Sequence, residues 1–160
     1  MTYEQLTEAL AAKLGIEGLV QEDGICSIEI DGMIVSLVHV EDADSLVLHG
    51  IVGDPPPEAE GRFGAMLLQA NNLFRGTLGA TLSQDPDSKA YALQRQYPLA
   101  MLDADSLAAG LETFTNTLER WREVLADFRP VEAALADTEA SAPLADTEAG
   151  FFGNGGFISV

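Results

Sequence analysis

Hydrophobic residues at the start of the chain follow a helical period. Their spacing of three or four residues places the side chains on one stripe of an α-helix. The stripe consists of Tyr3, Leu6, Leu10 and Leu14. Gly15 follows where helices commonly end in the left-handed conformation. We therefore predict an amphipathic helix that ends at Gly15.

The next segment alternates apolar and polar residues, which is typical of β-strands. Cys26–Ile30 and Met33–Val40 flank Asp31-Gly32, a dipeptide that favours a two-residue type I′ hairpin turn. Ser45–Val52 is predicted as a third strand. This register pairs Ile30 with Met33, Ile28 with Val35 and Cys26 with Leu37, and it predicts that one face of the sheet belongs to the core. With those six residues we assign to that face His39, Leu46 and Leu48.

The opposite face of these strands is also rich in apolar residues. Ser27, Glu29, Ser36 and His49 are interspersed there with Ile34, Val38, Val40, Val47 and Ile51. A sheet face that meets only solvent is more polar than this. We expect another element or another molecule to cover it.

The second half of the chain predicts a helix, a hairpin and a longer helix. After Asp54-Pro55-Pro56-Pro57, the first stripe consists of Phe63, Met66, Leu67, Ala70, Leu73 and Phe74. Strands are predicted at Ala80–Ser83 and Tyr91–Tyr97. The long helix begins with a cap at Asp103 or Asp105 and ends before Pro130. Its stripe consists of Leu107, Leu111, Phe114, Leu118, Trp121, Leu125 and Phe128.

The last 31 residues differ in composition. The hexapeptide Leu-Ala-Asp-Thr-Glu-Ala occurs at 135–140 and again at 144–149, and Gly and Phe follow. We divide the chain into a domain at 1–129 and an acidic, Gly-rich tail at 130–160 that we expect to be mobile. The tail is interpreted either as a solubilising extension or as a built-in mimic of a binding partner.

Charge and composition restrict the function. The chain carries a net charge of −18, which repels nucleic acid and anionic membrane surfaces. A single cysteine, Cys26, excludes an intramolecular disulfide, and no apolar run approaches the roughly 20 residues of a membrane span. We expect a cytoplasmic protein that neither binds nucleic acid nor inserts into a membrane.

No constellation for catalysis or for a cofactor stands out. His39 and His49 point to opposite faces in the predicted register, and Cys26 alone cannot complete a metal site. Asp103 and Asp105 lie at a helix start, where capping explains them, and no nucleophile accompanies a base. We predict no metal, no cofactor and no enzymatic activity.

The order helix, three strands, helix, two strands, helix resembles the class I type III secretion chaperones, the Tir-chaperone (CesT) family. The resemblance covers roughly Met1 to Arg129. It rests on the ordered set of segments 28–32, 51–53, 67–71, 79–82, 93–95 and 98–99, together with Leu107, Leu111, Phe114 and Trp121. The tail has no counterpart in that pattern.

The resemblance implies an α+β homodimer that binds the N-terminal segment of secreted effector proteins in a non-globular form, in the bacterial cytoplasm. It implies that the first helix and the N-terminal strands contact the client, which selects Leu6, Leu10, Ile34, Val38 and Val47. It places self-association on the second helix, which selects Phe63, Met66, Leu67 and Ala70. Two alternatives are a dimerisation module without a client and a domain that binds a small ligand.

Charge is distributed unevenly between these surfaces. Met1–Glu60 holds 13 acids and one base, whereas Gly61–Arg129 holds 8 acids and 7 bases. We therefore expect a basic client to dock on the N-terminal half, and we expect salt to weaken its association more than self-association.

Overall fold

The computed structural model describes residues 1–16, 21–57 and 59–129. The tail at 130–160, and with it both interpretations of the tail, lies outside the described residues. Residues Met1–Phe128 form one compact unit. The main elements in order are α1 (Tyr3–Leu14), β1 (Gln21–Glu22), β2 (Ile25–Ile30), β3 (Met33–Val40), β4 (Ser45–Gly53), α2 (Glu60–Asn71), β5 (Thr81–Gln84), β6 (Tyr91–Pro98) and α3 (Ala104–Asp127).

Short 3-10 helices join several of these elements. They are η1 (Glu41–Ala43), η2 (Asn72–Phe74) and η3 (Leu99–Met101). The succession of helices and strands is therefore the predicted one, with the two-residue strand β1 added at the start of the sheet.

The strands form one antiparallel sheet in the order β1-β2-β3-β4-β6-β5. The predicted β2–β3 register is confirmed: Ile30 lies opposite Met33, Ile28 opposite Val35 and Cys26 opposite Leu37. At the turn, Asp31 and Gly32 have φ angles of 50° and 74°, as a type I′ turn requires. The hydrophobic alternation thus places the predicted set of side chains on the core face.

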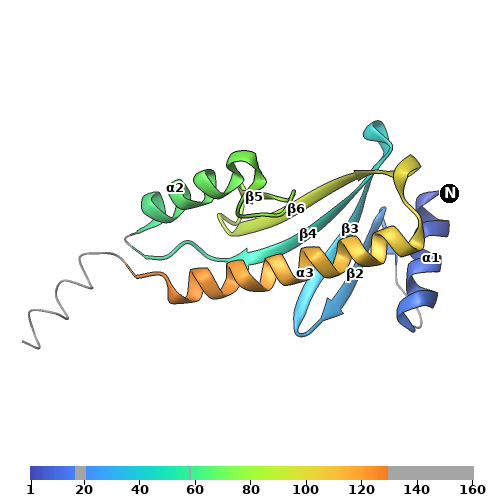
Figure 1. The fold of residues 1–160 in the computed structure, drawn as a ribbon, viewed down its shortest axis with the longest axis horizontal. Helices are drawn as coiled ribbons and strands as arrows, with labels where there is room; N and C mark the ends of the chain where they lie inside the picture. The colour runs from blue at the N-terminus through green and yellow to red at the C-terminus, as the bar shows by residue number, and fades with distance from the viewer. Residues whose placement is uncertain (17–20, 58, 130–160) are drawn as a thin grey trace, which may run out of the picture. The chain divides into compact units, whose positions relative to one another are not determined.

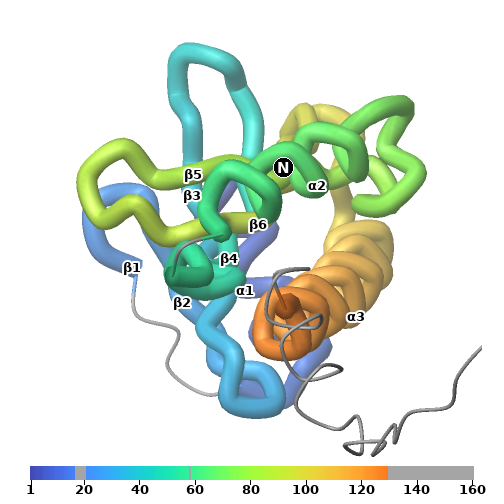
Figure 2. Tube along the Cα trace, turned by 90° about the vertical axis from the view of Figure 1, so that its left-hand side faces the viewer, coloured from blue at the N-terminus to red at the C-terminus, as the bar shows by residue number. Residues whose placement is uncertain are grey.

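All three α-helices of the described chain pack against the same face of the sheet (Figures 1 and 2). From α1, the Tyr3 hydroxyl donates a hydrogen bond to the Leu37 carbonyl of β3. Leu118 of α3 lies so close to Gly50 of β4 that a Cβ atom there would be 2.5 Å from the Leu118 Cδ2 atom. From α2, the ring of Phe63 packs on Tyr91 of β6.

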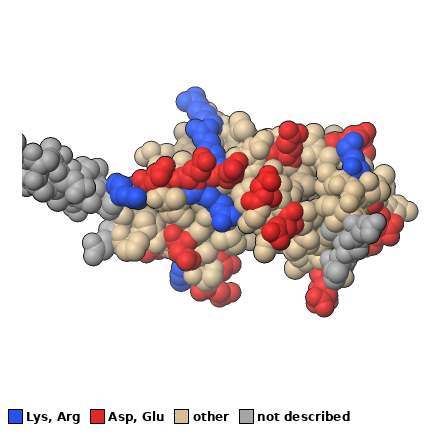
Figure 3. Space-filling view, turned by 90° about the horizontal axis from the view of Figure 1, so that it is seen from below, with Lys and Arg blue, Asp and Glu red and all other residues tan. Residues whose placement is uncertain are grey.

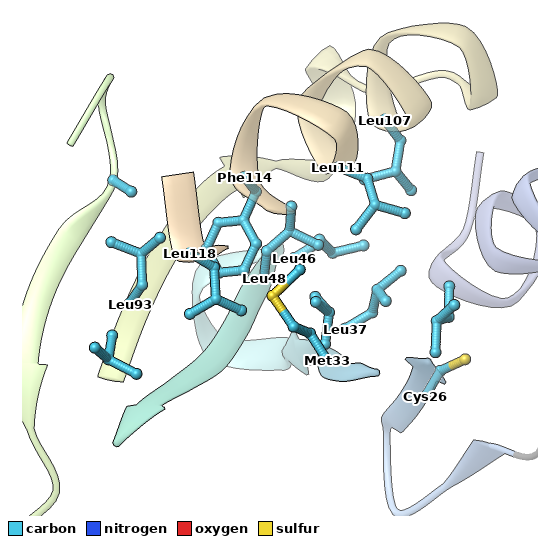
Figure 4. Packing of buried hydrophobic residues seen from close by; sticks show 14 of the residues in the cluster. Cys26, Met33, Leu37, Leu46, Leu48, Leu93, Leu107, Leu111, Phe114 and Leu118 are labelled. Carbon is cyan, nitrogen blue, oxygen red and sulfur yellow. The ribbon is translucent and has the colours of Figure 1, made fainter. Parts of the chain in front are cut away.

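The hydrophobic core lies between that face and the helices. Figure 4 shows the α3 side chains Leu107, Leu111, Phe114 and Leu118 directed toward the strands. Each of the four is at most 3% exposed. The predicted core face is confirmed for Cys26, Ile28, Met33, Val35, Leu37, Leu46 and Leu48, while Ile30 and His39 are half-buried.

Helix ends follow the predicted capping signals in α1 and α3. Gly15 ends α1 with a φ of 68°, and Asp103 caps α3, accepting a hydrogen bond of 2.7 Å from the Ser106 amide. Asp105 forms a 2.6 Å ion pair with Lys13 of α1. The two carboxylates therefore have structural roles at the start of α3.

The predicted continuation of the second helix to Leu73 and Phe74 is wrong. The helix ends at Asn71, whose side-chain amide donates to the Leu82 carbonyl and accepts from the Leu82 amide at 2.9 and 2.8 Å. Leu73 and Phe74 then take positive φ angles of 54° and 55° and are exposed. Asn71 thus bonds to β5, and the chain turns away from the helical path.

Candidate functional site

The face of the sheet that points away from the helices, called the outer face here, carries two apolar bands. The strand register aligns Ile25, Val38 and Val47 across β2, β3 and β4 as the first apolar band. Ile34 of β3 and Ile51 of β4 form the second apolar band, at the opposite end of these two strands, and Glu29 of β2 lies opposite Ile34. Ile25, Ile34 and Ile51 are 43%, 65% and 45% exposed.

A polar band separates the two apolar bands. It consists of Ser27, Ser36 and His49, which lie opposite one another in the register. The hydroxyl groups of Ser27 and Ser36 are 3.1 Å apart and share a hydrogen bond. Along β3 and β4 the outer face is therefore apolar at both ends and polar in the middle.

The strands that form the outer face are surrounded by negative charge. Residues 21–53 contain seven carboxylates and no Lys or Arg, and all seven carboxylates are exposed. They are Glu22, Asp23, Glu29, Asp31, Glu41, Asp42 and Asp44. Figure 3 shows another side of the molecule, on which carboxylates also outnumber basic side chains. Electrostatics at the outer face thus favours a basic partner.

A groove of about 380 Å³ opens beside the second apolar band. Ile34, Ile51 and His49 line it together with Arg122 of α3. A second hollow, lined by Glu22, Asp23, Ile25 and Ser27, lies beside the first apolar band. Both ends of the outer face therefore offer an indentation next to exposed aliphatic side chains.

The structure places the predicted client-binding residues in two different environments. Ile34 is exposed, and Val38 and Val47 are half-buried on the outer face. Leu6 and Leu10 of α1 are both 0% exposed and belong to the core. Their periodicity marks a buried stripe, so their side chains are not available to a partner in this conformation.

The predicted self-association residues divide in a similar way. Phe63 and Leu67 are buried at 0% and 5%, whereas Met66 and Ala70 are half-buried. Their neighbour Leu68 is 73% exposed and lines a groove of about 490 Å³ between α2 and β5, together with Gly61, Gly64, Leu82 and Tyr91.

Exposed apolar residues continue from α2 into the following loop. We call Leu68, Leu73, Phe74 and Leu78 the α2 patch; the last three are 71%, 51% and 62% exposed and all have positive φ angles. The loop is held from within, since Trp121 donates to the Gly76 carbonyl at 3.0 Å and Arg95 to the Leu78 carbonyl at 2.9 Å. Strained backbone that presents apolar side chains is typical of interaction surfaces.

Sequence reasoning missed Ile25, Leu68 and Leu78 as candidate contacts. The strand alternation could have predicted Ile25 as a contact, since it lies two residues before Ser27 on the same face. The helical period could have predicted Leu68 as a contact, because this residue lies just outside the positions assigned to the core. Leu78 carried no signal, because its exposure depends on a loop held by distant side chains.

His39 and Cys26 are positioned for packing. His39 stacks on Tyr3 with ring centroids 4.8 Å apart, while His49 faces outward. Burial raises the pKa of the Cys26 thiol, which keeps it neutral. Within the part of the chain that the structure describes, no three His, Cys, Asp or Glu side chains gather as a metal site.

Sequence comparison identifies the family. The model of the Tir chaperone protein (CesT) family matches residues 5–122. The chain belongs to the Tir chaperone protein (CesT) family. Among curated proteins, no sequence matches it.

Solved structures share the fold of this family member. A chain of the ExsC-ExsE complex superimposes with a TM-score of 0.67 at 22% identity, covering 78% of this chain and 97% of that one. The HopA1-SchA chaperone-effector complex gives a TM-score of 0.64 at 22% identity, covering 76% of this chain and 93% of that one. The Yersinia pestis type III secretion chaperone SycH was solved with a fragment of YscM2. It gives a TM-score of 0.60 at 23% identity, covering 75% of this chain and 99% of that one.

The similarity extends over about three quarters of this chain and more than nine tenths of each solved chain. The family match begins within α1 and ends within α3. Of the helices that the structure describes, none is long and apolar enough to cross a membrane.

Proposed function

We propose that this Tir-chaperone family member binds the N-terminal segment of a type III secretion effector in the bacterial cytoplasm and holds it in a non-globular, secretion-competent form. The observation that carries the proposal is the outer face, which none of the described helices covers and which has exposed aliphatic side chains and seven surrounding carboxylates. Family membership supports the same function, and complexes of fold relatives include a chaperone with an effector.

The sheet also offers main-chain hydrogen bonds to a client. Within the described residues, β1 pairs with Ile25 and Cys26, so Ser27–Ile30 of β2 have no neighbouring strand on that side. An extended segment that adds a strand there gains backbone hydrogen bonds whatever its sequence. Side-chain contacts on the outer face then provide selectivity.

Binding of this kind requires a large interface but no chemical step. Ordering an extended segment costs roughly 1–2 kcal/mol per residue in backbone entropy, which burial of apolar surface has to offset. The family is one of chaperones, and we propose that this protein acts by binding alone, without hydrolysis and without a cofactor.

We further propose that two copies associate through the α2 patch and the neighbouring groove. The small residues Gly61 and Gly64 line this groove beside Leu67 and Leu68, so a partner backbone can approach closely. Of the predicted interface residues, Met66 and Ala70 of α2 are half-buried. Phe63 and Leu67 support this surface from the core.

Co-expression with proteins encoded beside this chain tests the proposal. We expect one such protein to form a stable complex through its N-terminal segment, and that segment to resist proteolysis in the complex but to be digested when the partner is free. An otherwise identical partner without its N-terminal segment is the control. A stable dimer that recovers no such partner would instead support a dimerisation module, the candidate that the α2 patch favours.

A further inference from the structure

The loop that follows α2 holds three residues other than glycine in the left-handed backbone conformation. It spans residues 72–79 and joins α2 to β5 (Figure 1). Leu73, Phe74 and Leu78 have φ angles of 54°, 55° and 51°. Leucine and phenylalanine rarely adopt this conformation, because the Cβ atom then approaches the following carbonyl oxygen. The surrounding structure therefore has to hold the loop in place.

Contacts on the inner side of the loop hold it. The indole nitrogen of Trp121 in α3 donates a hydrogen bond of 3.0 Å to the Gly76 carbonyl. Arg95 of β6 donates one of 2.9 Å to the Leu78 carbonyl. Gly76 lies so close to the end of α2 that a Cβ atom there would be 2.8 Å from the Ala70 Cβ atom. Side chains from two distant elements and one close backbone approach thus fix the loop from within.

The outer side of the same loop presents apolar side chains. Leu73, Phe74 and Leu78 are 71%, 51% and 62% exposed. In a single copy this arrangement is unfavourable in two ways, because the backbone is strained and apolar surface remains in water. Both disadvantages are offset if the loop meets a partner in this conformation.

We infer that Trp121 and Arg95 position the loop 72–79 as a pre-formed docking element for a second copy of the chain, with Leu73 and Phe74 entering the groove beside Gly61 and Gly64 of that copy. The inference rests on the proposed self-association. It goes beyond it by naming the inserted side chains and the residues that position them.

The position of the groove relative to the loop favours a second copy as the partner. The groove of about 490 Å³ includes Leu68 and is lined toward the start of α2 by Gly64 and Gly61, which lie about 6 and 10 Å from Leu68 along the helix axis. The loop follows the opposite end of α2. In a two-fold dimer the same surface meets itself in reverse. Two α2 helices that cross at Leu68 therefore bring the loop of each copy over the groove of the other.

The groove has room for an inserted side chain. Within the described residues, a Cβ atom at Gly61 would meet nothing within 4 Å beyond its chain neighbours and its own helix backbone, and one at Gly64 would lie 3.9 Å from the Tyr91 hydroxyl. Leu67 and Leu82 line the same groove. Residues 60–79 contain one acidic and two basic residues, so charge does not oppose the pairing of two copies. An inserted aromatic ring would bury apolar surface on both sides.

Cysteine cross-linking tests the contact. Phe74→Cys is combined in the full chain with Gly61→Cys or with Gly64→Cys, two positions about one helical turn apart. The chain's own cysteine, Cys26, is buried. We expect mild oxidation to give a covalent dimer with at least one of the two pairs, and about tenfold less with any of the three single variants, because a disulfide requires Cα atoms within about 7 Å of each other.

Two further variants test the positioning residues. Trp121→Phe and Arg95→Met each remove a donor to the loop and keep most of the apolar packing. We expect each to raise the dimer dissociation constant about tenfold or more, measured by sedimentation equilibrium, because the loop is then no longer pre-formed. Tyr3→Phe is the matched control: it removes a buried hydrogen bond of 2.7 Å between α1 and β3 and should leave the dimer dissociation constant unchanged.

Leu73→Asn distinguishes docking from a purely structural role. Asparagine adopts the left-handed conformation more readily than leucine, so the thermal midpoint of a single copy should rise by about 2 °C. This midpoint is measured in a chain that also carries Leu68→Asp, so that self-association does not contribute. In the otherwise natural chain, Leu73→Asn should raise the dimer dissociation constant severalfold. A loop that only connects α2 to β5 would show the first effect without the second.

The inference and the proposed function fail through different results. A dimer that cross-links through neither glycine, or that is unaffected by both Trp121→Phe and Arg95→Met, would overturn the inference alone. A natural chain that is monomeric would overturn the inference together with self-association, and a co-expressed effector that still binds would leave the chaperone function standing. A cross-linking dimer that binds no effector would overturn the chaperone function and support the inference.

Discussion

The hydroxyl group of Tyr3 in α1 donates a hydrogen bond of 2.7 Å to the carbonyl oxygen of Leu37 in β3, 34 residues away. Both residues are at most 1% exposed, and the tyrosine ring also stacks on His39 of the same strand. This contact fastens the first helix to the centre of the sheet. It holds α1 on the core side, so that Leu6 and Leu10 are buried.

Replacing Tyr3 by Phe is expected to lower the free energy of unfolding by about 1 kcal/mol, because the ring is retained and a buried hydrogen bond is lost. Urea denaturation monitored by circular dichroism measures the difference. Tyr91→Phe is the matched control, since the Tyr91 hydroxyl donates a longer bond of 3.3 Å to the Glu60 carbonyl. A larger loss for Tyr91→Phe than for Tyr3→Phe would contradict the prediction.

The same tyrosine makes stability depend on pH in the alkaline range. Burial raises the pKa of Tyr3 from 10.0 to about 12. Between these values the unfolded chain has lost the phenolic proton while the folded chain keeps it. The folded state then binds more protons, so its stability falls as pH rises from about 10 to about 12 and is unaffected below this range.

Urea midpoints measured at several pH values in that range are expected to fall more steeply for the natural chain than for Tyr3→Phe. One group can contribute a slope of at most about 1.4 kcal/mol per pH unit. Burial also raises the pKa values of Tyr91 and Tyr97, so a residual slope persists in the variant. Identical slopes for the two proteins would exclude Tyr3 as the origin.

Local patterns were sufficient to predict most of the fold. The alternation of Cys26–Ile30 and Met33–Val40 around Asp31-Gly32 determines both the register and the buried face, since a slip of one residue would expose the whole core set. The stripe from Leu107 to Trp121 likewise predicts the side of α3 that is buried.

The candidate surfaces could be predicted only in part, because periodicity reports burial and does not distinguish the chain's own core from a partner. Leu6, Leu10, Phe63 and Leu67 belong to apolar stripes, and the structure buries all four. Ile34 was identified because it lies on the face opposite to such a stripe. The end of α2 escaped prediction, since it depends on a hydrogen bond from Asn71 to the distant residue Leu82.

That bond makes Asn71→Asp a sensitive test of the packing of α2 on β5. Aspartate keeps the shape of the side chain but loses the donor to the Leu82 carbonyl and brings a negative charge toward it. We expect a loss of roughly 1–3 kcal/mol in the free energy of unfolding. Asn72→Asp, the same change at the next residue, which is exposed, should stay within about 0.5 kcal/mol.

Self-association is tested by introducing a charge at Leu68. Because this side chain is 73% exposed in one copy, Leu68→Asp should leave the fold and its thermal midpoint intact while placing an uncompensated charge in the proposed interface. Sedimentation velocity is expected to show a monomer. Leu14→Asp, at an exposed position at the end of α1, should sediment as the unchanged protein does.

Leu67→Asp gives a different readout, since Leu67 is 5% exposed and a charge there is buried within one copy. It is expected to destabilise the fold itself. Retention of a dimer by Leu68→Asp would rule out the α2 patch as the interface.

Salt should separate the two proposed interfaces, because they differ in charge. The outer face lies among seven carboxylates without a base, whereas Glu60–Gly79 contains one acidic and two basic residues. Screening by added salt acts on long-range attraction, so the association rate of a basic client peptide should fall about tenfold between low and high ionic strength. The dimer dissociation constant should change much less.

Stopped-flow fluorescence gives the association rate, and sedimentation equilibrium gives the dimer constant. Glu29→Gln, in β2 on the outer face, should slow association at low salt, whereas Glu112→Gln, in α3 on the other side of the sheet, should have little effect. If the client association rate and the dimer dissociation constant were equally sensitive to salt, the charge of residues 21–53 would not guide the client. Electrostatic attraction would then have to come from the protein as a whole, since its net charge of −18 acts on every basic partner.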